Sequence, residues 1–333
     1  MGPAPFVVTI LITQMKDEPG THPAAGRPAR LAVGIIGVGR AGTALGLALA
    51  RAGHQVVAVS AVSDASQRRA AANFPAAVIT EPGQVLRRAD LAMLTVPDDA
   101  LPGLVAGLAV TGAPLEGRML VHASGRYGVS VLEPAVRQGA LPLALHPVMT
   151  FTGRGDDVDR LHGTSFGVTA PEVLRPAAEA LVIEMGGEPV FIAEEHRDLY
   201  HAAIAGAANH LITLVAQAMD LLRTAGVAEP ARLLAPLLSA SLDNALRFGD
   251  AGLTGPVARG DAATVAAHVA ALEAATSAAA AAGTPAARVA AASPPAVAAY
   301  VAMARLTADR ALAAGILRPA DAERLLDVLG GRP

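Results

Sequence analysis

The sequence contains no cysteine and no tryptophan, and Lys16 is its only lysine. Without cysteine, the chain has no disulfide, thiol nucleophile or cysteine metal site, which fits a cytoplasmic enzyme. Beyond residue 16, no lysine is present to act as an acid, a base or a Schiff-base former. Aromatic residues make up only 3% of the chain, so we expect a core of alanine, valine and leucine.

Tracts of basic residues are missing as well. The net charge is −3, which argues against nucleic acid as a partner. Histidine and acidic residues do not cluster at the spacing of metal ligands, so we predict no metal. The chain has 333 residues, of which 53% are hydrophobic, and this length favours two domains.

The first 30 residues lack the pattern of a folded element. Residues 6–12 are apolar, but they are too short to span a bilayer and no basic residue precedes them. Proline, glycine and threonine dominate residues 19–30. We therefore predict a disordered extension over residues 1–30, with Met15 as an alternative start, and no membrane anchor.

A glycine-rich turn stands between a predicted strand over residues 31–36 and a predicted helix over residues 43–53, and a second strand follows at residues 56–59. This is the context in which a GxGxxG pattern binds a dinucleotide. Gly37 would allow the tight turn, Gly39 the approach of the pyrophosphate, and Gly42 the close packing of helix and strand. The predicted cofactor loop comprises Gly37, Val38, Gly39, Arg40, Ala41 and Gly42.

The residues after the second strand bear on the type of dinucleotide. NAD sites usually carry an acidic residue at the end of this strand, and residues 60–63 contain none. Ser63, Ser66, Arg68 and Arg69 are suited to a 2′-phosphate, so we predict NADP. Asp64 leaves NAD as an alternative cofactor. In a further alternative, both arginines are exposed to solvent and bind no ligand.

Strands and helices continue to alternate up to residue 193. Predicted strands cover residues 77–80, 91–96, 118–122, 141–145, 164–169 and 189–192, with helices at 81–88, 129–138 and 171–185. Repeated strand–helix units indicate an α/β fold with a mostly parallel sheet. Val96 and Pro97 end one strand where the cofactor would pass, although an ordinary turn is the alternative.

From residue 194 onward, the sequence predicts helices only. They cover residues 195–223, 230–248, 262–282, 295–315 and 319–329. Residues 199–219 carry no charged side chain, but their histidine, asparagine and glutamine residues would be costly in lipid. We therefore expect a Rossmann domain over residues 31–193 and an all-helical substrate or dimerisation domain over residues 194–330.

Several polar residues are candidates for chemistry. His146 ends a strand, at the edge where such folds bind ligands, and a pKa near neutrality would let it donate and accept protons. A structural histidine in a proline-bounded turn is the alternative. His201 and Asn209 are candidates for orienting the substrate or the nicotinamide, or for buried polar groups. His122 is expected to pack within its strand, and Asp261 to cap a helix.

Five stretches together resemble a bacterial family with a Rossmann-like N-terminal domain and a C-terminal domain of unknown function. They are GVGRAG at 37–42, HASG at 122–125, LHPVMTF at 145–151, LYHAA at 199–203 with Asn209, and LTGPVARGD at 253–261 with His268. This family is similar to pyrroline-5-carboxylate reductases and β-hydroxyacid dehydrogenases, and some members are thought to be ketopantoate reductases. The resemblance covers residues 31–330 and implies NAD(P) binding and an often dimeric protein.

The resemblance also implies roles for individual residues. Ser124 and Gly125 resemble the Ser-Gly substrate-binding pair of β-hydroxyacid dehydrogenases, and a simple turn is the alternative. The His146-Pro147 pair is similar to one in prephenate dehydrogenases, where the histidine contacts the reacting hydroxyl. Arg259 is the favoured cation for a substrate carboxylate. Asn209 matches an asparagine of the dehydrogenases, but Ala205 stands where they carry a catalytic lysine.

The predicted function is therefore an NADP-dependent oxidoreductase that reduces a small carboxylate-bearing carbonyl compound. Ketopantoate, a compound of pantothenate biosynthesis, is the first expectation, and it rests on the family resemblance. An imine reductase of the pyrroline-5-carboxylate type and a non-catalytic dinucleotide sensor remain open, and a methyltransferase is less consistent with the complete GxGxxG. We expect a cytoplasmic homodimer that assembles through residues 194–330.

Overall fold

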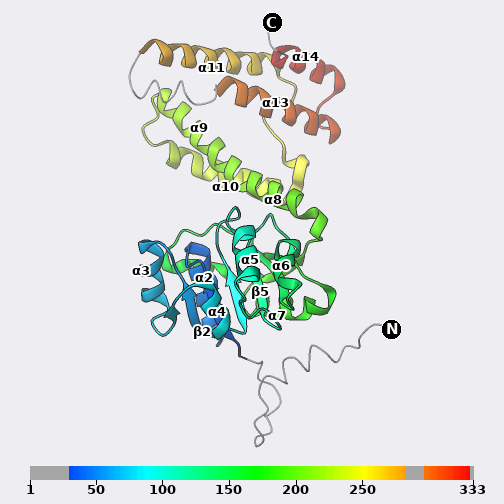
Figure 1. Ribbon diagram of the computed structural model, residues 1–333. Coiled ribbons are helices and arrows are strands. Elements are labelled where there is room, and N and C mark those ends of the chain that lie inside the picture. The colour runs from blue at the N-terminus through cyan, green and yellow to red at the C-terminus, as the bar shows by residue number, and fades with distance from the viewer. Residues whose placement is uncertain (1–29, 283–295, 331–333) are drawn as a thin grey trace, which may run out of the picture. The chain divides into compact units, whose positions relative to one another are not determined.

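Strands and helices alternate in the first part of the chain, and the remainder is helical (Figure 1). The computed structural model describes residues 30–282 and 296–330. Within this part, the chain divides into two compact units, one ending at Ala207 and the other beginning at Ala208. The extension expected over residues 1–30, including Lys16, lies outside the described residues except for Arg30.

Eight strands of the first unit form one sheet in the order β3-β2-β1-β4-β5-β6-β7-β8. Short apolar runs make up the central strands, as expected for strands that are covered on both faces. The strands are β1 (Ala32–Ile36), β2 (Gln55–Ser60), β3 (Val78–Ile79), β4 (Leu91–Leu94), β5 (Met119–His122), β6 (Leu141–Pro147), β7 (Ser165–Thr169) and β8 (Glu188–Phe191).

The first six strands are parallel, which confirms the expected mostly parallel sheet. Strand β7 instead runs antiparallel to β6, and β8 is parallel to β7. A parallel connection needs a crossover, usually a helix. Between β6 and β7 the chain forms only two short 3₁₀ turns, Gly155–Asp157 and Asp159–Leu161, so β7 returns beside β6 in the opposite direction.

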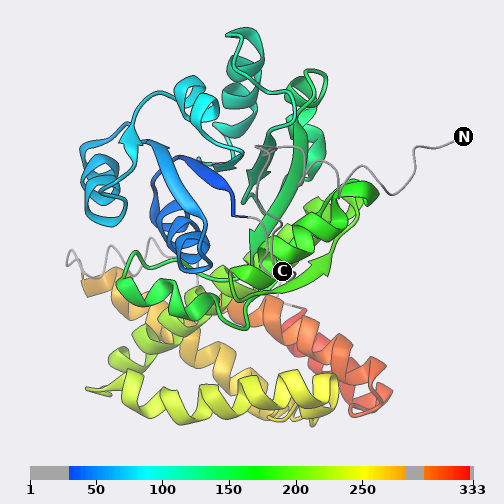
Figure 2. The ribbon, with the colours of Figure 1, turned by 90° about the horizontal axis from the view of Figure 1, so that it is seen from below.

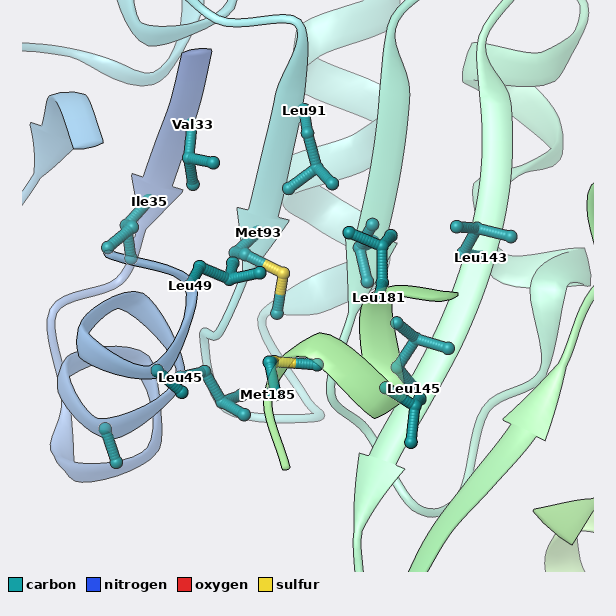
Figure 3. Close-up of a cluster of buried hydrophobic side chains, with 14 of the residues drawn as sticks. Val33, Ile35, Leu45, Leu49, Leu91, Met93, Leu143, Leu145, Leu181 and Met185 are labelled. Atoms are coloured by element: carbon teal, nitrogen blue, oxygen red, sulfur yellow. The ribbon is translucent and has the colours of Figure 1, made fainter. Parts of the chain in front are cut away.

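Helices cover both faces of this sheet (Figure 2). Residues of α2 (Arg40–Arg51), α3 (Asp64–Asn73) and α7 (Arg175–Glu184) pack on one face, and Figure 3 shows part of that cluster, with Leu45, Leu49, Leu181 and Met185 against the strands. Residues of α4 (Pro82–Arg88), α5 (Leu101–Val110), the 3₁₀ turn η1 (Val129–Leu132) and α6 (Glu133–Val136) pack on the other face.

Two details of the first unit differ from the sequence prediction. Helix α5 was not predicted, because Pro102, Gly103 and Gly107 interrupt its pattern, yet Leu101, Val105 and Leu108 are buried on one side. The predicted helix over residues 129–138 is a 3₁₀ turn followed by a single α-helical turn. Pro134 occupies the first turn of α6, where the lack of an N–H is tolerated.

Helices α9 (Leu211–Thr224), α10 (Pro230–Phe248), α11 (Ala262–Ala282), α13 (Ala296–Ala313) and α14 (Pro319–Leu329) make up the second unit. The bounds of α10, α11 and α14 are those predicted from the sequence. Helices α11, α13 and α14 share a small apolar core, to which Val257 and Ala258 in the segment before α11 also contribute. Helices α9 and α10 lie side by side and contribute no residue to that core (Figure 1).

The long helical segment between the sheet and α9 begins in the first unit. It consists of the 3₁₀ turn η5 (Glu194–His196), α8 (Arg197–Ala205) and the π-helical turn η6 (Gly206–His210). We expected the domain boundary at residue 194, but the two units divide after Ala207. The difference arises because η5 and α8 are bonded to the sheet, where Arg197 is 2% exposed.

One helical segment of the described chain, Glu194–Thr224, is long and apolar enough to cross a membrane on length and composition alone. A helix of a protein interface meets the same criteria. The start of this segment is part of the sheet unit, since Arg197 donates hydrogen bonds to the carbonyl oxygens of Gly167 and Ala144. None of the apolar window is buried within the described residues, so the expectation that the rest of the segment packs on protein stays a prediction.

Candidate functional site

The glycine loop joins β1 to α2 at the carboxyl edge of the sheet. Gly37 has φ of +101°, a conformation that favours glycine. A Cβ atom on Gly42 would lie 2.3 Å from the carbonyl oxygen of Gly37 and 2.4 Å from Oγ1 of Thr95, so only glycine lets α2 pack this closely. The hydroxyl of Thr95, at the end of β4, donates to the same Gly37 oxygen at 2.7 Å and holds the turn.

Gly39 differs from the other two loop glycines. A Cβ atom built on it would meet nothing within 4 Å, and its φ of −80° is accessible to any residue. Packing within the protein therefore does not require glycine here. Gly39, at the N-cap, has no side chain to cap α2, so the first backbone N–H groups of the helix remain available to a ligand. This open cradle at a helix N-terminus fits a pyrophosphate.

The residues expected to bind a 2′-phosphate lie at the start of α3. The hydroxyl of Ser63 accepts a bond from the N–H of Ser66, and the buried hydroxyl of Ser66 donates to the Ser63 carbonyl at 2.7 Å. Both serines are thus engaged in the helix cap. Arg68 is exposed, whereas Arg69 donates from Nε to the carbonyl oxygen of Val38 at 3.1 Å. Arg68 is therefore the more available cation.

The remaining expected cofactor residues lie around the same edge. Val96 and Pro97 follow β4 directly, next to the Thr95–Gly37 contact. Arg40 is exposed at the first position of α2, and its side chain lies against Gly153 in the loop after β6. The structure thus places the expected loop residues, Val96 and Pro97 around the carboxyl ends of β1 and β4, where the strand order reverses.

A second group of polar residues follows β5. Nε2 of His122 lies 2.8 Å from the carbonyl oxygen of Gly128, and Nδ1 accepts the N–H of Ser124. Burial lowers the pKa of His122 to about 4, so this fully buried ring is neutral and structural, as expected. The hydroxyl of Ser124 accepts the N–H of Tyr127, which closes the turn.

The side chains of His146, His201 and Tyr200 meet where β5 and β6 end. A Cβ atom on Gly125 would lie 2.9 Å from Nε2 of His146 and 2.7 Å from Cδ2 of His201, so both imidazoles converge on this glycine. The two rings are 6.1 Å apart in an edge-to-face arrangement. On its other side, Nδ1 of His146 lies 2.8 Å from the hydroxyl of Tyr200 on α8. The structure therefore brings His146, His201 and Gly125 together.

The charge state of His146 differs from the expectation. Burial, followed by the nearby guanidinium of Arg197, lowers the pKa of His146 to about 4, rather than leaving it near neutrality. The imidazole is therefore neutral at physiological pH. A neutral imidazole can still donate a hydrogen bond to a substrate oxygen from its protonated nitrogen.

Arg197 and Tyr200 are the site residues for which the sequence analysis proposed no role. Arg197 is 2% exposed and donates to Thr169 Oγ1 at 2.7 Å and to the Gly167 carbonyl at 3.0 Å, and its Nη1 has no partner in the part of the chain that the structure describes. Within the described residues, no carboxylate forms an ion pair with it. Its guanidinium carbon lies 5.5 Å from the centre of the Tyr200 ring. A lone arginine at the start of an apolar helix gave little indication of this burial.

Glu194 fixes the start of the helical segment that carries these residues. Its carboxylate accepts the N–H groups of Val129 at 2.7 Å and Ser130 at 3.1 Å, at the beginning of η1. A Cβ atom on Gly128 would overlap the same carboxylate. The loop after β5 and the start of α8 are thereby held together, and with them the positions of Gly125 and His201.

Other expected residues belong to the second unit. Arg259 is exposed before α11, and Asn209 is exposed in the π-helical turn η6. Their expected roles toward substrate and nicotinamide stay predictions. Asp261 accepts the N–H of Thr264 at 3.0 Å, which confirms it as a helix cap. Within the described residues, no group of three or more acidic or histidine side chains is placed to hold a metal ion.

Two family models match this chain in succession. Residues 16–147 match a Rossmann-like domain, and residues 164–307 match a domain of unknown function, DUF2520. The chain combines a Rossmann-like domain with a DUF2520 domain. This arrangement agrees with the resemblance inferred from the five sequence stretches.

Individual relatives support the same fold. A glycerol-3-phosphate dehydrogenase [NAD(P)+] of Thermus thermophilus is 29% identical over 236 residues, which cover 66% of this chain and 68% of that protein. A Bacteroides fragilis protein assigned as an NADP oxidoreductase superposes with a TM-score of 0.64 at 21% identity, covering 84% of this chain and 98% of its own. An imine reductase of Pseudomonas sp. gives a TM-score of 0.59 at 21% identity, covering 90% and 99%. At these identities, the two structural matches establish a shared fold.

Proposed function

We propose that this DUF2520 protein is an NADP-dependent oxidoreductase that reduces the carbonyl group of a small carboxylate-bearing compound. The observation that carries the proposal is the convergence of His146, His201 and Gly125 at the same sheet edge as the open glycine loop. Ligands of doubly wound folds bind at this edge. The relatives named as NAD(P)-dependent dehydrogenases and reductases support the same reaction class.

The glycine loop supports the cofactor part of the proposal. Gly39 leaves open space at the N-terminus of α2, where the uncapped N–H groups of the first turn suit a pyrophosphate. Arg68 is the proposed partner of the 2′-phosphate, with Ser63 beside it. When bound, reduced NADP supplies a hydride. The protein must then meet the charge that develops on the substrate heteroatom.

His146 is proposed to meet that charge. With its Nδ1 bonded to Tyr200, the ring presents Nε2 toward Gly125 and His201. A neutral imidazole with its proton on Nε2 donates a hydrogen bond to a carbonyl oxygen and gives up that proton as the oxygen becomes an alkoxide. His201 and Ser124 are proposed to orient the substrate next to it.

The electrostatics favour a carbonyl over an imine substrate. Arg197 places a buried positive charge near His146 without an ion-pair partner in the described chain. Such a field stabilises a developing alkoxide and disfavours a protonated, positively charged imine. Imine reduction of the pyrroline-5-carboxylate type is the second candidate, because imine reductases and pyrroline carboxylate reductases share the fold.

Ketopantoate is the first substrate to test, and Arg259 is the proposed partner of its carboxylate. The assay follows NADPH absorbance with ketopantoate, pyrroline-5-carboxylate and prephenate-like acids, and the reverse direction with glycerol 3-phosphate and NADP. We expect turnover of a carbonyl acid. Tight NADPH binding by calorimetry without turnover of any compound would favour a non-catalytic sensor.

The variant His146→Asn tests the role of the histidine. It keeps a donor of similar size but has no imidazole proton to give. We expect NADPH to bind within a few-fold of the wild-type affinity and the rate to fall by about 10²–10⁴, the usual contribution of one acid–base group. A wild-type rate would make His146 structural and leave His201 or Ser124 as the proton donor.

A further inference from the structure

The hydroxyl of Tyr200 is held at one position on the sheet. Tyr200 lies one helical turn after the start of α8, and its hydroxyl is 2.8 Å from Nδ1 of His146, with the two rings edge to face at 87°. Gly167 of β7 pairs with His146 of β6, and a Cβ atom on Gly167 would lie 2.2 Å from the hydroxyl oxygen. A glycine in the strand is thus needed to admit this hydroxyl.

The surroundings of Tyr200 favour one direction for this hydrogen bond, from the hydroxyl to His146. Burial raises the pKa of Tyr200, so its hydroxyl is protonated at neutral pH and can donate that proton. Arg197, which lies over the ring, has only donors to offer. In the described chain, the acceptor within reach of the hydroxyl is Nδ1 of His146. Donation by Tyr200 requires the imidazole proton to be on Nε2, the nitrogen that faces Gly125.

We propose that Tyr200, supported by Arg197, is the positioning residue that fixes the Nε2–H tautomer of His146 and keeps the ring neutral by giving a proton to Nδ1 when Nε2 loses its own. The inference rests on the proposed function. As the substrate carbonyl carbon accepts a hydride, its oxygen takes the proton from Nε2, and the Tyr200 hydroxyl gives its proton to Nδ1. After the product leaves, Nε2 takes a proton from water and the Nδ1 proton returns to the phenolate, so the hydroxyl and the Nε2–H tautomer are both regenerated and one solvent proton is consumed per turnover.

The buried guanidinium gives this relay its driving force. When Tyr200 becomes a phenolate, its negative charge lies beside a buried cation that forms no ion pair with a carboxylate of the described chain. Arg197 is fixed there by bonds to Thr169, Gly167 and Ala144, so it needs no rearrangement. His146 is only partly buried, so water can reach its Nε2 after turnover.

Histidine ¹⁵N NMR on the protein without substrate tests the tautomer directly. We expect the His146 signals, assigned from their loss in His146→Asn, to show an unprotonated Nδ1 and a protonated Nε2. In Tyr200→Phe, which keeps the ring and loses the hydroxyl, His146 should populate both tautomers. His268 is an internal reference, because its Nδ1 contacts the hydroxyl of Tyr300 at 2.8 Å and should not change. A proton on Nδ1 in the wild type would overturn the proposal.

Kinetics of the same variant test the proton transfer. With the substrate found above, we expect Tyr200→Phe to lower kcat by roughly 10–100-fold, the range for partners that orient a functional histidine. The NADPH dissociation constant should stay unchanged, and the solvent deuterium isotope effect on kcat should rise. An unchanged kcat and isotope effect would refute the relay. If the tautomer is as predicted but no compound is reduced, the proposed function fails and the assignment of the tautomer survives.

Discussion

Gly39 and Gly42 stand three residues apart in the glycine loop but have opposite surroundings, and substitutions at the two positions should separate nucleotide binding from folding. A side chain at Gly39 enters open space, whereas a Cβ atom at Gly42 overlaps the Gly37 carbonyl oxygen and the Thr95 hydroxyl. We therefore expect Gly39→Val to lose the cofactor and to keep the fold. Gly42→Ala should destabilise the fold itself.

The magnitudes follow from these contacts. The backbone at Gly39 suits any residue, so Gly39→Val should change the free energy of unfolding by less than about 1 kcal/mol. Charge-assisted hydrogen bonds contribute about 1.5–3 kcal/mol each. The loss of two such bonds from the loop to the pyrophosphate weakens binding roughly 10²–10⁴-fold. Gly42→Ala should cost about 1–3 kcal/mol of stability or more, because the overlapping atom is a backbone oxygen.

Urea unfolding and calorimetric titration with NADPH measure the two effects separately. Gly39→Ala is the matched control for Gly42→Ala, since both variants add one methyl group to the same loop. Wild-type NADPH affinity in Gly39→Val would refute the assignment of the loop as the pyrophosphate site. A Gly42→Ala protein as stable as the wild type would show that the close approach of α2 to β1 can relax at no cost.

Three further predictions concern the 2′-phosphate, assembly and pH. In calorimetry, Arg68→Ala should weaken the binding of NADPH by roughly 1–3 kcal/mol more than the binding of NADH. Arg69→Ala, which frees the Val38 carbonyl, should weaken the binding of both cofactors. If Arg68→Ala weakened the binding of NADPH and NADH equally, as Arg69→Ala should, the assignment of Arg68 to the 2′-phosphate would be contradicted. The chain should be a homodimer by light scattering at micromolar concentration, and Leu237→Glu on exposed α10 should yield monomers while Val110→Glu does not. The pKa values of His122 and His146 lie at about 4 in the folded chain, below the unfolded value near 6.5. The free energy of unfolding should therefore be full above pH 6.5 and should fall as the pH is lowered toward 4. In urea unfolding, His122→Gln should make this fall with pH less steep.

Much of the fold follows from local sequence patterns. Apolar runs bounded by turn residues predicted the strands, and proline or glycine boundaries predicted α10, α11 and α14. Helix α5 was missed because proline and glycine within Leu101–Val110 mask its apolar side. The direction of β7 was missed for another reason, since a strand has the same side-chain period whichever way it runs.

The candidate site was predicted only where a motif carries its own chemistry. The glycine loop has such a motif, and the end of β6 drew attention to His146. The role of Tyr200 depends on a pairing of β6 with β7 that sets Gly167 opposite His146, which no local pattern contains. The low pKa of His146 likewise depends on burial and on Arg197, which is distant in sequence.

The reversal of β7 decides the direction in which the chain leaves the sheet. After a parallel strand, the next helix starts at the carboxyl edge and runs away from the ligand. Because β7 and β8 run the opposite way, α8 starts near Thr169 and Ala144 and passes back toward the ligand edge, where Tyr200 and His201 meet His146. One change of strand direction thus brings α8 back along the sheet to line the candidate site.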